Sequence, residues 1–583
     1  MPLKKYGELL AKYLGTQWPR VALLTVLLFG GIGLQLASPQ VIRYFIDTAQ
    51  SHGAQQSLLM AAMLFVAIAL VSQVVRLATN YAVASIGWTA TNALRADLTL
   101  HCLRLDMPFH KQHTPGELIE RIDGDVTALA NFFSQFILRV MGNALLVIGI
   151  LALLFREDVR VGAGLTLYVL VTLLLLAVMQ RHAVPRWAAG RQSSADLFGF
   201  MEERISGTED IRASGAEPYM LNRLYRLMRA WLEKRRAAIV LSVLVVGMAN
   251  VLYVISYAIG LAVGVYLYTY GAATIGTAYI IVYYIGKLSA PVQSIRSEVQ
   301  DLQQATASIL RINELFELRP QVQDKAGQPD SKVALAGPLS VELHNVSFGY
   351  EDNENVLDEL SFQLQPGKVL GVLGRTGSGK TTITRLLFRL YDPASGVIRL
   401  NDVDMRDIPL AELRERVGMV TQDVQLFQAT VRDNLTFFDH RISDTHIKAI
   451  LREVGLWDWF QSLPGGLDTG LAASGQGLSA GEAQLLALTR VFLKNPGLVI
   501  LDEASARLDP ATEIWLERAV AQLLADRTGI VIAHRLRTVQ RADDILILDS
   551  GRVVEYGSRE DLASDPSSRF YHLLQTGLEA VLA

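Results

Sequence analysis

Long apolar runs without charge fall almost entirely before about residue 290, and the rest of the chain reads as a water-soluble α/β domain. A helix that spans a bilayer needs about 20 predominantly apolar residues. Residues 21–42 and 161–180 each supply one such run. Residues 237–286 contain no Lys, Arg, Asp or Glu, which is long enough for two spans joined by a turn at 270–272. This pattern predicts four spans.

Two further spans fit around residues 58–75 and 132–155, the second interrupted only by Arg139, so we expect six in all. Orientation follows from Lys and Arg, which are retained on the cytoplasmic side. The amino end and the two long connections carry clusters of Lys and Arg, whereas the links at 50–57 and 270–276 carry none. Both chain ends are therefore expected in the cytoplasm.

The composition agrees with a membrane protein, because 51% of residues are hydrophobic and only 19% are charged, against about 25% charged in a typical soluble domain. The 54 Lys and Arg nearly balance the 57 Asp and Glu, so there is no global electrostatic reason to bind nucleic acid. The single cysteine, Cys102, excludes an intramolecular disulfide framework and multi-cysteine metal sites. We expect it to be a small apolar filler.

Polar helical sequence surrounds the spans. Residues 3–15 predict an amphipathic helix, which either lies in the membrane interface or packs on the protein. Residues 88–106 and 198–234 continue the spans as long cytoplasmic stalks. Each long connection contains a break, at 107–116 and at 214–218, where a short transverse helix fits.

A phosphate-binding loop follows a buried apolar strand at residues 369–373. Glycines at this spacing let backbone N–H groups face phosphates, Lys380 reaches the β- and γ-phosphates, and Thr381 can hold Mg²⁺. The helix predicted at 380–390 adds its positive end. The predicted ATP-binding residues of this loop are Gly374, Arg375, Thr376, Gly377, Ser378, Gly379, Lys380, Thr381 and Thr382.

Two acidic residues end a second apolar strand, which begins at Leu498. A nucleotide site that hydrolyses needs a carboxylate for the metal and a base for water. Asp502 is the candidate metal ligand, and Glu503 is the candidate base that polarises the attacking water. Without the phosphate-binding loop, the pair would read as a solvated strand end.

With these motifs, residues from about 340 to 575 resemble the nucleotide-binding domain of an ATP-binding-cassette transporter. The residues before it resemble the six-helix membrane domain of exporter-type members, in which two such chains pair. The resemblance implies a multi-domain fold: an all-α transmembrane domain at 1–318 with long cytoplasmic extensions, a linker at 319–338, and an α/β P-loop domain at 339–577.

The resemblance assigns three further residues. Tyr350 matches the aromatic that stacks on adenine, although a core or edge tyrosine is the alternative. Gln422 matches the glutamine that joins the network of metal and water and senses the membrane domain. His534, after another apolar strand, matches the histidine that contacts the γ-phosphate and orients water.

The signature motif of the family departs from its usual Leu-Ser-Gly-Gly-Gln and reads LSAGE at 478–482. Ser479 and Gly481 still offer a hydroxyl and an N–H to a γ-phosphate at a helix start. Ala480 adds a Cβ where close backbone approach is wanted, and Glu482 places an anion near a polyphosphate. We therefore expect this half-site to bind or hydrolyse less well.

Two more departures accompany the altered signature. Ala473 stands where the family usually has an acid, and the loop that ends in Asp509, the D-loop, begins with Ala506 rather than Ser. This combination resembles one chain of a pair with two different halves. The hypothesis is a heterodimer with one competent ATP site, and the alternative is a homodimer that tolerates the relaxed signature.

The resemblance implies ATP and Mg²⁺ as cofactors and export of hydrophobic or amphipathic drugs, lipids or peptides across the cytoplasmic membrane. Import on the same scaffold, or an ATP-gated channel or regulatory subunit, remains open. Arg76 and Arg139 lie within apolar spans and either bind an acidic or amphipathic substrate in a cavity or snorkel to water. Asn80, Asn143 and Asn250 either line the same cavity or join helices.

Overall fold

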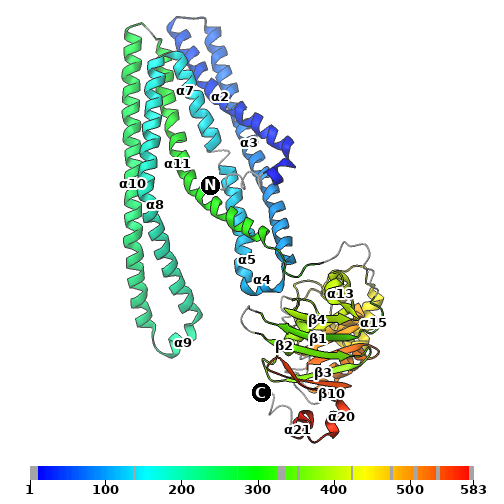
Figure 1. Cartoon of the computed structure of the whole chain (residues 1–583). Helices are drawn as coiled ribbons and strands as arrows, with labels where there is room; N and C mark the ends of the chain where they lie inside the picture. Colours follow the sequence, from blue (N-terminus) through cyan, green and yellow to red (C-terminus); the bar gives the residue numbers. More distant parts are fainter. Residues whose placement is uncertain are drawn as a thin grey trace. The chain divides into compact units, whose positions relative to one another are not determined.

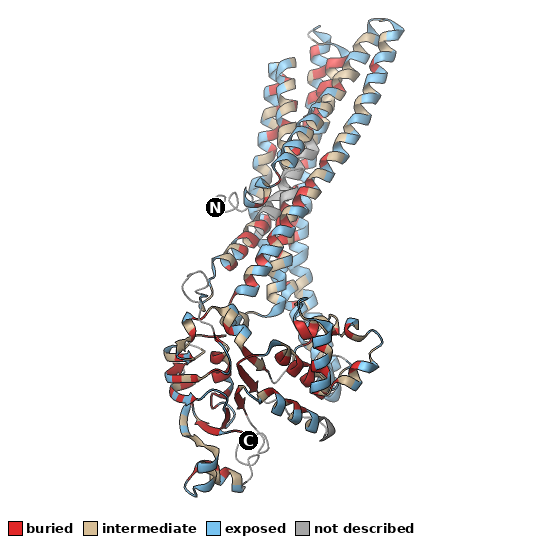
Figure 2. Cartoon of the chain, turned by 90° about the vertical axis from the view of Figure 1, so that its right-hand side faces the viewer, coloured by how far each residue is buried: buried red, intermediate tan, exposed pale blue. Residues whose placement is uncertain are grey.

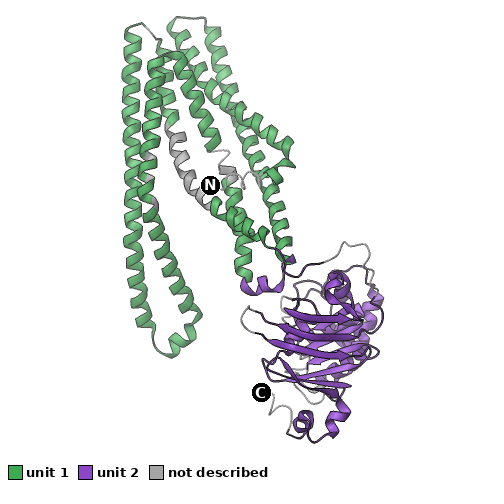
Figure 3. Cartoon of the chain, in the orientation of Figure 1, with its two compact units in different colours: residues 1–103, 114–318 green, residues 104–113, 319–583 purple. Residues whose placement is uncertain are grey.

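A computed structural model describes residues 11–135, 140–271, 273–324, 335–350, 355–421, 424–472, 477–502, 510–532 and 539–576. The chain divides into two compact units (Figure 3). Unit 1 comprises residues 1–103 and 114–318, and unit 2 comprises residues 104–113 and 319–583. The helical unit and the mixed-sheet unit have the fold class predicted from the sequence.

Long helices build unit 1 (Figure 1). They are α2 (Trp18–Gln50), α3 (Gln55–Arg104), α7 (Gly142–Glu157), α8 (Val159–Ser206), α10 (Glu217–Thr269) and α11 (Ile275–Glu317). Among the described residues, α2, α3, α8 and α10 are long and apolar enough to cross a membrane, and Ile275–Leu288 is a shorter apolar helix. The prediction of six spans stays a prediction.

The outward surfaces of these helices are largely uncovered by the chain itself. Only 6% of the most apolar windows of α2 and α3 is buried, against 29% in α8 and 22% in α10. Such apolar surface suits lipid or a second chain. Ile281 and Tyr284 of α11 pack with Ile150 and Leu154 of α7 in one buried apolar cluster. Figure 2 shows exposed positions along much of the length of the long helices.

Local sequence explains where the helices begin and end. The Asp158 side chain accepts hydrogen bonds from the backbone of Arg160 and Val161 at the start of α8, and Thr274 caps α11 in the same way. Helix α10 ends at Thr269, and Gly271 follows with φ +68°. The predicted turn therefore lies where the charge-free stretch changes direction.

A short helix, α4 (Met107–Gln112), occupies the first predicted break. At the second, predicted at 214–218, the short helix α9 (Thr208–Ala213) lies directly before the break instead, and α10 already begins at Glu217. Helix α4 groups with unit 2 rather than with the helices on either side of it (Figure 3). The amino-terminal helix is described only from residue 11, and its Tyr13 hydroxyl donates to Asp97 of α3 at 2.8 Å.

The stalk contains one irregular element that the sequence analysis missed. Residues Glu120–Asp125 form a π-helix, η1, between α5 (Pro115–Ile119) and α6 (Val126–Gln135). It presents Asp125 to α11, where the carboxylate accepts hydrogen bonds from Ser308 Oγ at 2.9 Å and from Arg311 Nε at 2.8 Å. Extra residues in a helical turn of this kind often mark a functional site.

Two sheets build unit 2 (Figure 1). The larger has the strand order β10-β9-β3-β8-β7-β6, and the smaller has the order β2-β1-β4-β5. The strands are β1 (Val341–Phe348), β2 (Leu357–Leu364), β3 (Val369–Gly374), β4 (Ser395–Leu400), β5 (Val403–Asp404), β6 (Val417–Val420), β7 (Leu498–Asp502), β8 (Thr528–Ile532), β9 (Asp544–Asp549) and β10 (Arg552–Ser558).

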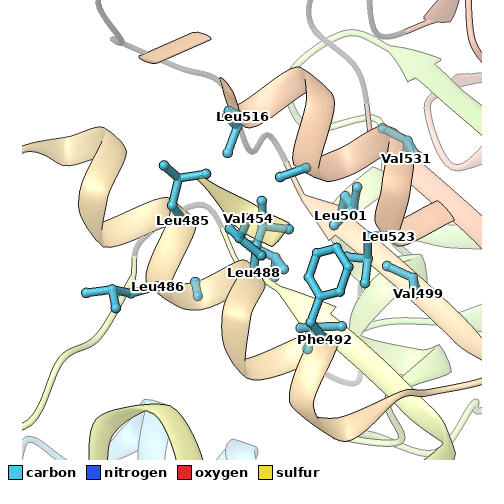
Figure 4. Close-up of a cluster of buried hydrophobic side chains, with 14 of the residues drawn as sticks. Val454, Leu485, Leu486, Leu488, Phe492, Val499, Leu501, Leu516, Leu523 and Val531 are labelled. Carbon is cyan, nitrogen blue, oxygen red and sulfur yellow. The ribbon is translucent and has the colours of Figure 1, made fainter. Parts of the chain in front are cut away.

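The helices of unit 2 pack on the strands or on one another. After β1 they include α12 (Lys380–Leu387), α13 (Leu410–Arg416), α14 (Val431–Thr436), α15 (Asp444–Val454), α16 (Trp457–Ser462), α17 (Ala480–Lys494), α18 (Pro510–Leu524), α20 (Arg559–Ser564) and α21 (Arg569–Thr576). Leu488 and Phe492 of α17 pack with Leu501 of β7 and Leu523 of α18 in one apolar cluster (Figure 4). This cluster fixes the start of α17, and with it the signature motif, against the strand that ends at Asp502.

One predicted boundary is wrong. The helix expected at 380–390 ends at Leu387, because Arg389 has φ +50° and leaves helical geometry. The Arg389 side chain is 3% exposed, pairs with Asp392, and donates to the carbonyls of Ile408 and Gln323. These bonds tie the end of the loop helix to the segment that follows α11.

Candidate nucleotide site

The candidate site lies at one edge of the larger sheet. Strands β3, β8 and β7 are neighbours and run parallel, so their carboxyl ends meet at the same edge, where open α/β sheets bind ligands. Strand β3 ends at Gly374 and enters the glycine-rich loop, and β7 ends at Asp502. The two motifs found in the sequence are thus separated by one strand.

Backbone geometry explains two of the loop glycines. Gly377 has φ +83°, and a Cβ there would meet nothing within 4 Å. Gly379 has φ +103° and directly precedes α12, where a Cβ would lie 2.6 Å from Leu357 Cδ2. A side chain would strain both positions. The loop therefore keeps its backbone N–H groups on an open surface at a helix start, which favours an anion.

Lys380 is almost fully buried inside this loop, at 6% exposure. Its Nζ donates to the carbonyls of Gly374 at 2.7 Å and Arg375 at 2.9 Å. A buried ammonium is stable only with such partners. The bonds hold the charge beneath the loop, where a phosphate can reach it.

The loop also contains one unsatisfied group. Ser378 is 3% exposed, and its Oγ is buried without a hydrogen-bond partner among the described residues. An orphaned buried hydroxyl costs stability unless a ligand completes it. Thr381 is exposed beside it, at the start of α12. The loop residues present therefore fit a phosphate-bearing ligand and its magnesium ion.

The structure describes only some of the residues predicted to act in hydrolysis. Asp502 is 9% exposed at the end of β7. Glu503, Gln422, His534 and Asp509 lie outside the described residues. Their roles, and the metal role of Asp502, stay predictions.

Tyr350 sits in a polar and aromatic cluster near the loop. Its hydroxyl lies 3.1 Å from Thr382 Oγ1 and accepts from Arg385 Nη1 at 2.9 Å. Tyr391 meets its ring edge on, with centroids 5.3 Å apart. Lys111 of α4 places Nζ 4.5 Å from the ring centroid. The residue predicted to stack on adenine thus forms hydrogen bonds with the phosphate-loop helix, and its ring contacts a lysine of α4.

The signature residues begin helix α17 through a capping box. Ser479 Oγ accepts from the Glu482 backbone at 3.2 Å, and Glu482 Oε2 accepts from the Ser479 backbone at 2.7 Å and from the Ser479 hydroxyl at 2.9 Å. The Glu482 carboxylate therefore engages the hydroxyl that Ser479 was expected to offer to a phosphate. The Ser-x-x-Glu spacing is a recognised capping signal, so the sequence contained it. Ala473 lies outside the described residues.

A groove of about 650 Å³ begins directly beside Thr421, the residue before Gln422. Phe427 and Phe437 line it and are 47% and 57% exposed. Arg490 and Lys494 of α17 also line it, and burial lowers the pKa of both, to about 10 for Arg490. An open apolar groove with poorly solvated cations is suited to bind another segment of protein.

Helix α4, at the first predicted break, makes contacts within unit 2. Lys111 meets Tyr350, and the Asp106 carboxylate before α4 accepts from the Val322 backbone at 3.4 Å and from the Gln321 backbone. The contact between Lys111 and Tyr350 could not be predicted from the sequence, because the two residues are far apart in the chain.

Comparison with known proteins decides the family. Residues 21–292 match the family described as ABC transporter transmembrane region, and residues 357–506 match the family described as ABC transporter. The chain is 30% identical to the probable multidrug resistance ABC transporter ATP-binding/permease protein YheH of Bacillus subtilis, over 80% of this chain and 69% of that one. The chain belongs to the ABC transporter family.

Two further comparisons cover nearly the full length. The ABC transporter chain is 29% identical to the ATP-dependent lipid A-core flippase of Pseudomonas fluorescens, over 98% of this chain and 96% of that one. A solved structure of a bacterial Atm1-family ABC exporter with ATP bound superposes with a TM-score of 0.79 at 25% identity, covering 96% of this chain and 98% of that chain. The chain is thus a multi-pass membrane protein that binds ATP and couples its hydrolysis to transport.

Proposed function

We propose that this ABC transporter exports hydrophobic or amphipathic compounds across the cytoplasmic membrane as one half of a heterodimer. The observation that carries the proposal is the fusion of an exporter-type membrane region and a nucleotide-binding domain in one chain. Relatives named for multidrug resistance and for lipid A-core flipping support a hydrophobic or amphipathic substrate. The solved neighbour is an exporter, which disfavours import.

The hydrolytic residues have separate roles in this proposal. The loop 374–382 holds the phosphates, Tyr350 stacks on adenine, and Mg²⁺ would be held by Thr381, Gln422 and Asp502. A bound magnesium ion supplies charge stabilisation for phosphoryl transfer. Glu503 and His534 position and polarise the attacking water. The orphaned Ser378 hydroxyl and the buried Lys380 support the phosphate part of this assignment.

The asymmetry proposal assigns two unequal sites to the pair. The competent site combines this chain's loop, Asp502, Glu503 and His534 with a partner's signature. The second site combines the partner's loop with Ser479, Ala480, Gly481 and Glu482 of this chain, and Asp509 contributes near the interface. Support comes from the capping box, which directs an anion at the donors of the second site. That site mostly holds nucleotide.

ATP hydrolysis is coupled to the membrane domain through closure of two nucleotide-binding domains. ATP favours the closed pair over the open pair because it binds the closed pair more tightly. We assign the coupling to the two cytoplasmic connections, around 107–118 and 213–222. In the second connection, Tyr219 and Leu221 are 64% and 51% exposed. In the first, Lys111 of α4 meets Tyr350.

Transport in inside-out membrane vesicles tests the exporter proposal. ATP-dependent accumulation of a fluorescent amphiphile, lost when Lys380→Ala replaces the loop lysine, is the expected result. The control is Lys448→Ala on α15, which leaves accumulation unchanged. Accumulation only in right-side-out vesicles would identify an importer, and single-channel currents would identify a channel.

Gentle purification of the tagged chain from its own membranes tests the pairing. We expect an equimolar second half-transporter with an intact Leu-Ser-Gly-Gly-Gln and an altered acid after its metal-binding Asp. An active complex that contains this chain alone would instead establish the homodimer.

A further inference from the structure

A basic surface lies where α8 and α10 run side by side in unit 1, at the point where the charge-free stretch of each helix ends (Figure 1). Exposed cations from both helices form it, and we call it the basic patch. They are Arg181, Arg186 and Arg191 of α8 and Lys234, Arg235 and Arg236 of α10.

Two contacts fix the register of the two helices at this level. Trp187 Nε1 of α8 donates to Ser242 Oγ of α10 at 3.0 Å. Nearby, a Cβ on Gly190 would lie 4.0 Å from the Cα atom of Arg235. The other cations of the patch are close neighbours in sequence of these contact residues, so they form one surface rather than two separate clusters.

Few carboxylates offset the positive charge of the patch. Helix α8 contains no Asp or Glu before Asp196, whose carboxylate accepts from Gln192 at 3.0 Å. On α10, Glu233 is the only acid between Pro218 and the end of the helix. Within the part of the chain that the structure describes, none of the patch cations forms an ion pair. The patch therefore presents unpaired positive charge to its surroundings.

Helix length places part of the patch at the level of lipid headgroups. The charged link at 156–160 puts Val159, the first residue of α8, outside the hydrocarbon core. Arg181 and Arg186 follow Val159 by 22 and 27 positions, or about 33 and 40 Å at a rise of 1.5 Å per residue. The hydrocarbon core of a bilayer is about 30 Å thick, and the headgroup regions extend the total to about 40–45 Å. Both guanidinium groups thus reach the headgroups of the opposite leaflet, which is cytoplasmic in the orientation predicted above.

The sequence of α10 agrees with this level. Residues 237–269 carry no Lys, Arg, Asp or Glu, and the three cations of α10 follow directly at the margin of the headgroup layer. Trp187 and Trp231 stand beside patch cations, and the Arg235 guanidinium lies 5.0 Å from the centre of the Trp231 ring. Tryptophan is enriched at membrane interfaces. Long Lys and Arg side chains can keep their charge among headgroups while their aliphatic stems lie along apolar surface.

We propose that the basic patch binds the anionic headgroups of resident phospholipids in the cytoplasmic leaflet. Each cation held close to an anionic bilayer surface contributes a modest attraction, and these attractions add over a cluster. A phosphatidylglycerol headgroup suits the patch because its phosphate can accept parallel N–H donors from a guanidinium group. The lipid bound here belongs to the bilayer and is not cargo, so the inference goes beyond the proposed export function.

Two lipids with the same acyl chains test the patch, namely dioleoyl phosphatidylglycerol and dioleoyl phosphatidylcholine. The half-saturating concentration of each is measured for the purified full transporter in neutral detergent. We expect Arg186→Gln with Arg235→Gln to raise the value for phosphatidylglycerol by about tenfold, the effect of two lost surface cations, and to leave phosphatidylcholine unchanged. Lysine at both positions retains most of the affinity. The control, Arg223→Gln with Arg226→Gln, removes two exposed cations of α10 farther from its apolar stretch and changes neither lipid.

Added salt gives a second readout, because it screens exposed charges. Raising NaCl from about 50 to about 300 mM should weaken phosphatidylglycerol binding to the native transporter several-fold and to the double glutamine variant much less. Equal affinities of the native transporter for both lipids, or equal losses in the double variant and the control, overturn the proposal. If the double variant keeps its affinity for phosphatidylglycerol but no longer co-purifies with a second chain, the patch contacts protein and the proposal is wrong.

Vesicles that contain a fluorescent phosphatidylglycerol separate a resident lipid from a transported one. We expect ATP to leave the distribution of this lipid between the leaflets unchanged. ATP-dependent movement that the double variant abolishes would make the lipid cargo and would contradict the resident role. The binding measurement needs no transport, so it decides the patch whether or not the export proposal holds.

Discussion

The Nζ atom of Lys111 lies 4.5 Å from the centre of the Tyr350 ring. Lys111 belongs to α4, in the first cytoplasmic connection of the membrane domain, and Tyr350 follows β1 of the nucleotide-binding domain. The Tyr350 hydroxyl is bonded to Arg385 of the phosphate-loop helix. Tyr350 thus contacts both α4 and the helix that follows the predicted phosphate-binding loop.

This contact predicts an effect on the apparent affinity for ATP. A cation over an aromatic ring is worth about 0.5–1 kcal/mol at an exposed site, and adenine needs a face of the same ring. Lys111→Met keeps the aliphatic stem and removes the charge, so we expect the KM for ATP to fall by about two- to fivefold. ATPase assays of the full complex measure it, and Lys448→Met on α15 serves as the control. An unchanged or higher KM shows that Lys111 does not compete with adenine.

Glu482 has two properties that substitutions can separate: its negative charge and its part in the capping box at the start of α17. Glu482→Gln keeps a side chain that can accept from the Ser479 backbone but removes the anion, so we expect thermal stability to hold and photolabelling of the second site by an azido-ATP to rise. Glu482→Ala removes the carboxylate half of the capping box, while Ser479 still accepts from the backbone of residue 482. We expect this change to lower the melting temperature of the complex. Labelling that stays the same in Glu482→Gln would contradict the repulsion attributed to this carboxylate.

The buried carboxylate of η1 is a stability determinant of the stalk. Asp125 is 4% exposed and bonded to Ser308 and Arg311, and this hydrogen bonding raises the pKa of Arg311 above its ordinary value. Asp125→Asn leaves the guanidinium with a weaker partner, so we expect a loss of about 1–3 kcal/mol, seen as a lower melting temperature in detergent. Asp123→Asn, at the exposed neighbouring acid, should cost much less. Equal losses would mean that the buried pair has no special role.

Cys102 is expected to be unreactive. It is 3% exposed in the stalk part of α3, and burial raises the pKa of its thiol, which lowers the thiolate fraction that reacts. Maleimide labelling of the folded transporter should be slow and should become rapid in denaturant. Fast labelling in the folded state would show that this part of α3 opens readily.

Local sequence predicts those elements whose boundaries depend on residues close together in the chain. The strand before the glycine-rich loop, the turn at Gly271 and the break at α4 all follow from apolar runs and from Gly or Pro at fixed places. The end of α12 was misjudged because Arg389 leaves the helix to make buried bonds with distant segments, which no local pattern encodes.

The site divides in the same way. The phosphate loop and Asp502 could be predicted from the sequence because each motif is contiguous and lies at the end of a strand. The pairing of Lys111 with Tyr350, and of Asp125 with Arg311, joins residues that only tertiary structure brings together. The Ser-x-x-Glu spacing at 479–482 encodes the capping role of Glu482, in addition to the negative charge that this residue carries.

The central claim is that this chain supplies the one competent hydrolytic site of an asymmetric pair. Steady-state ATP hydrolysis by the purified complex with Glu503→Gln in this chain tests it most directly, with the matching substitution in the partner as the comparison. We expect Glu503→Gln to abolish turnover and the partner's substitution to change it little. Substantial turnover in Glu503→Gln would contradict the claim and place competent chemistry in the second site.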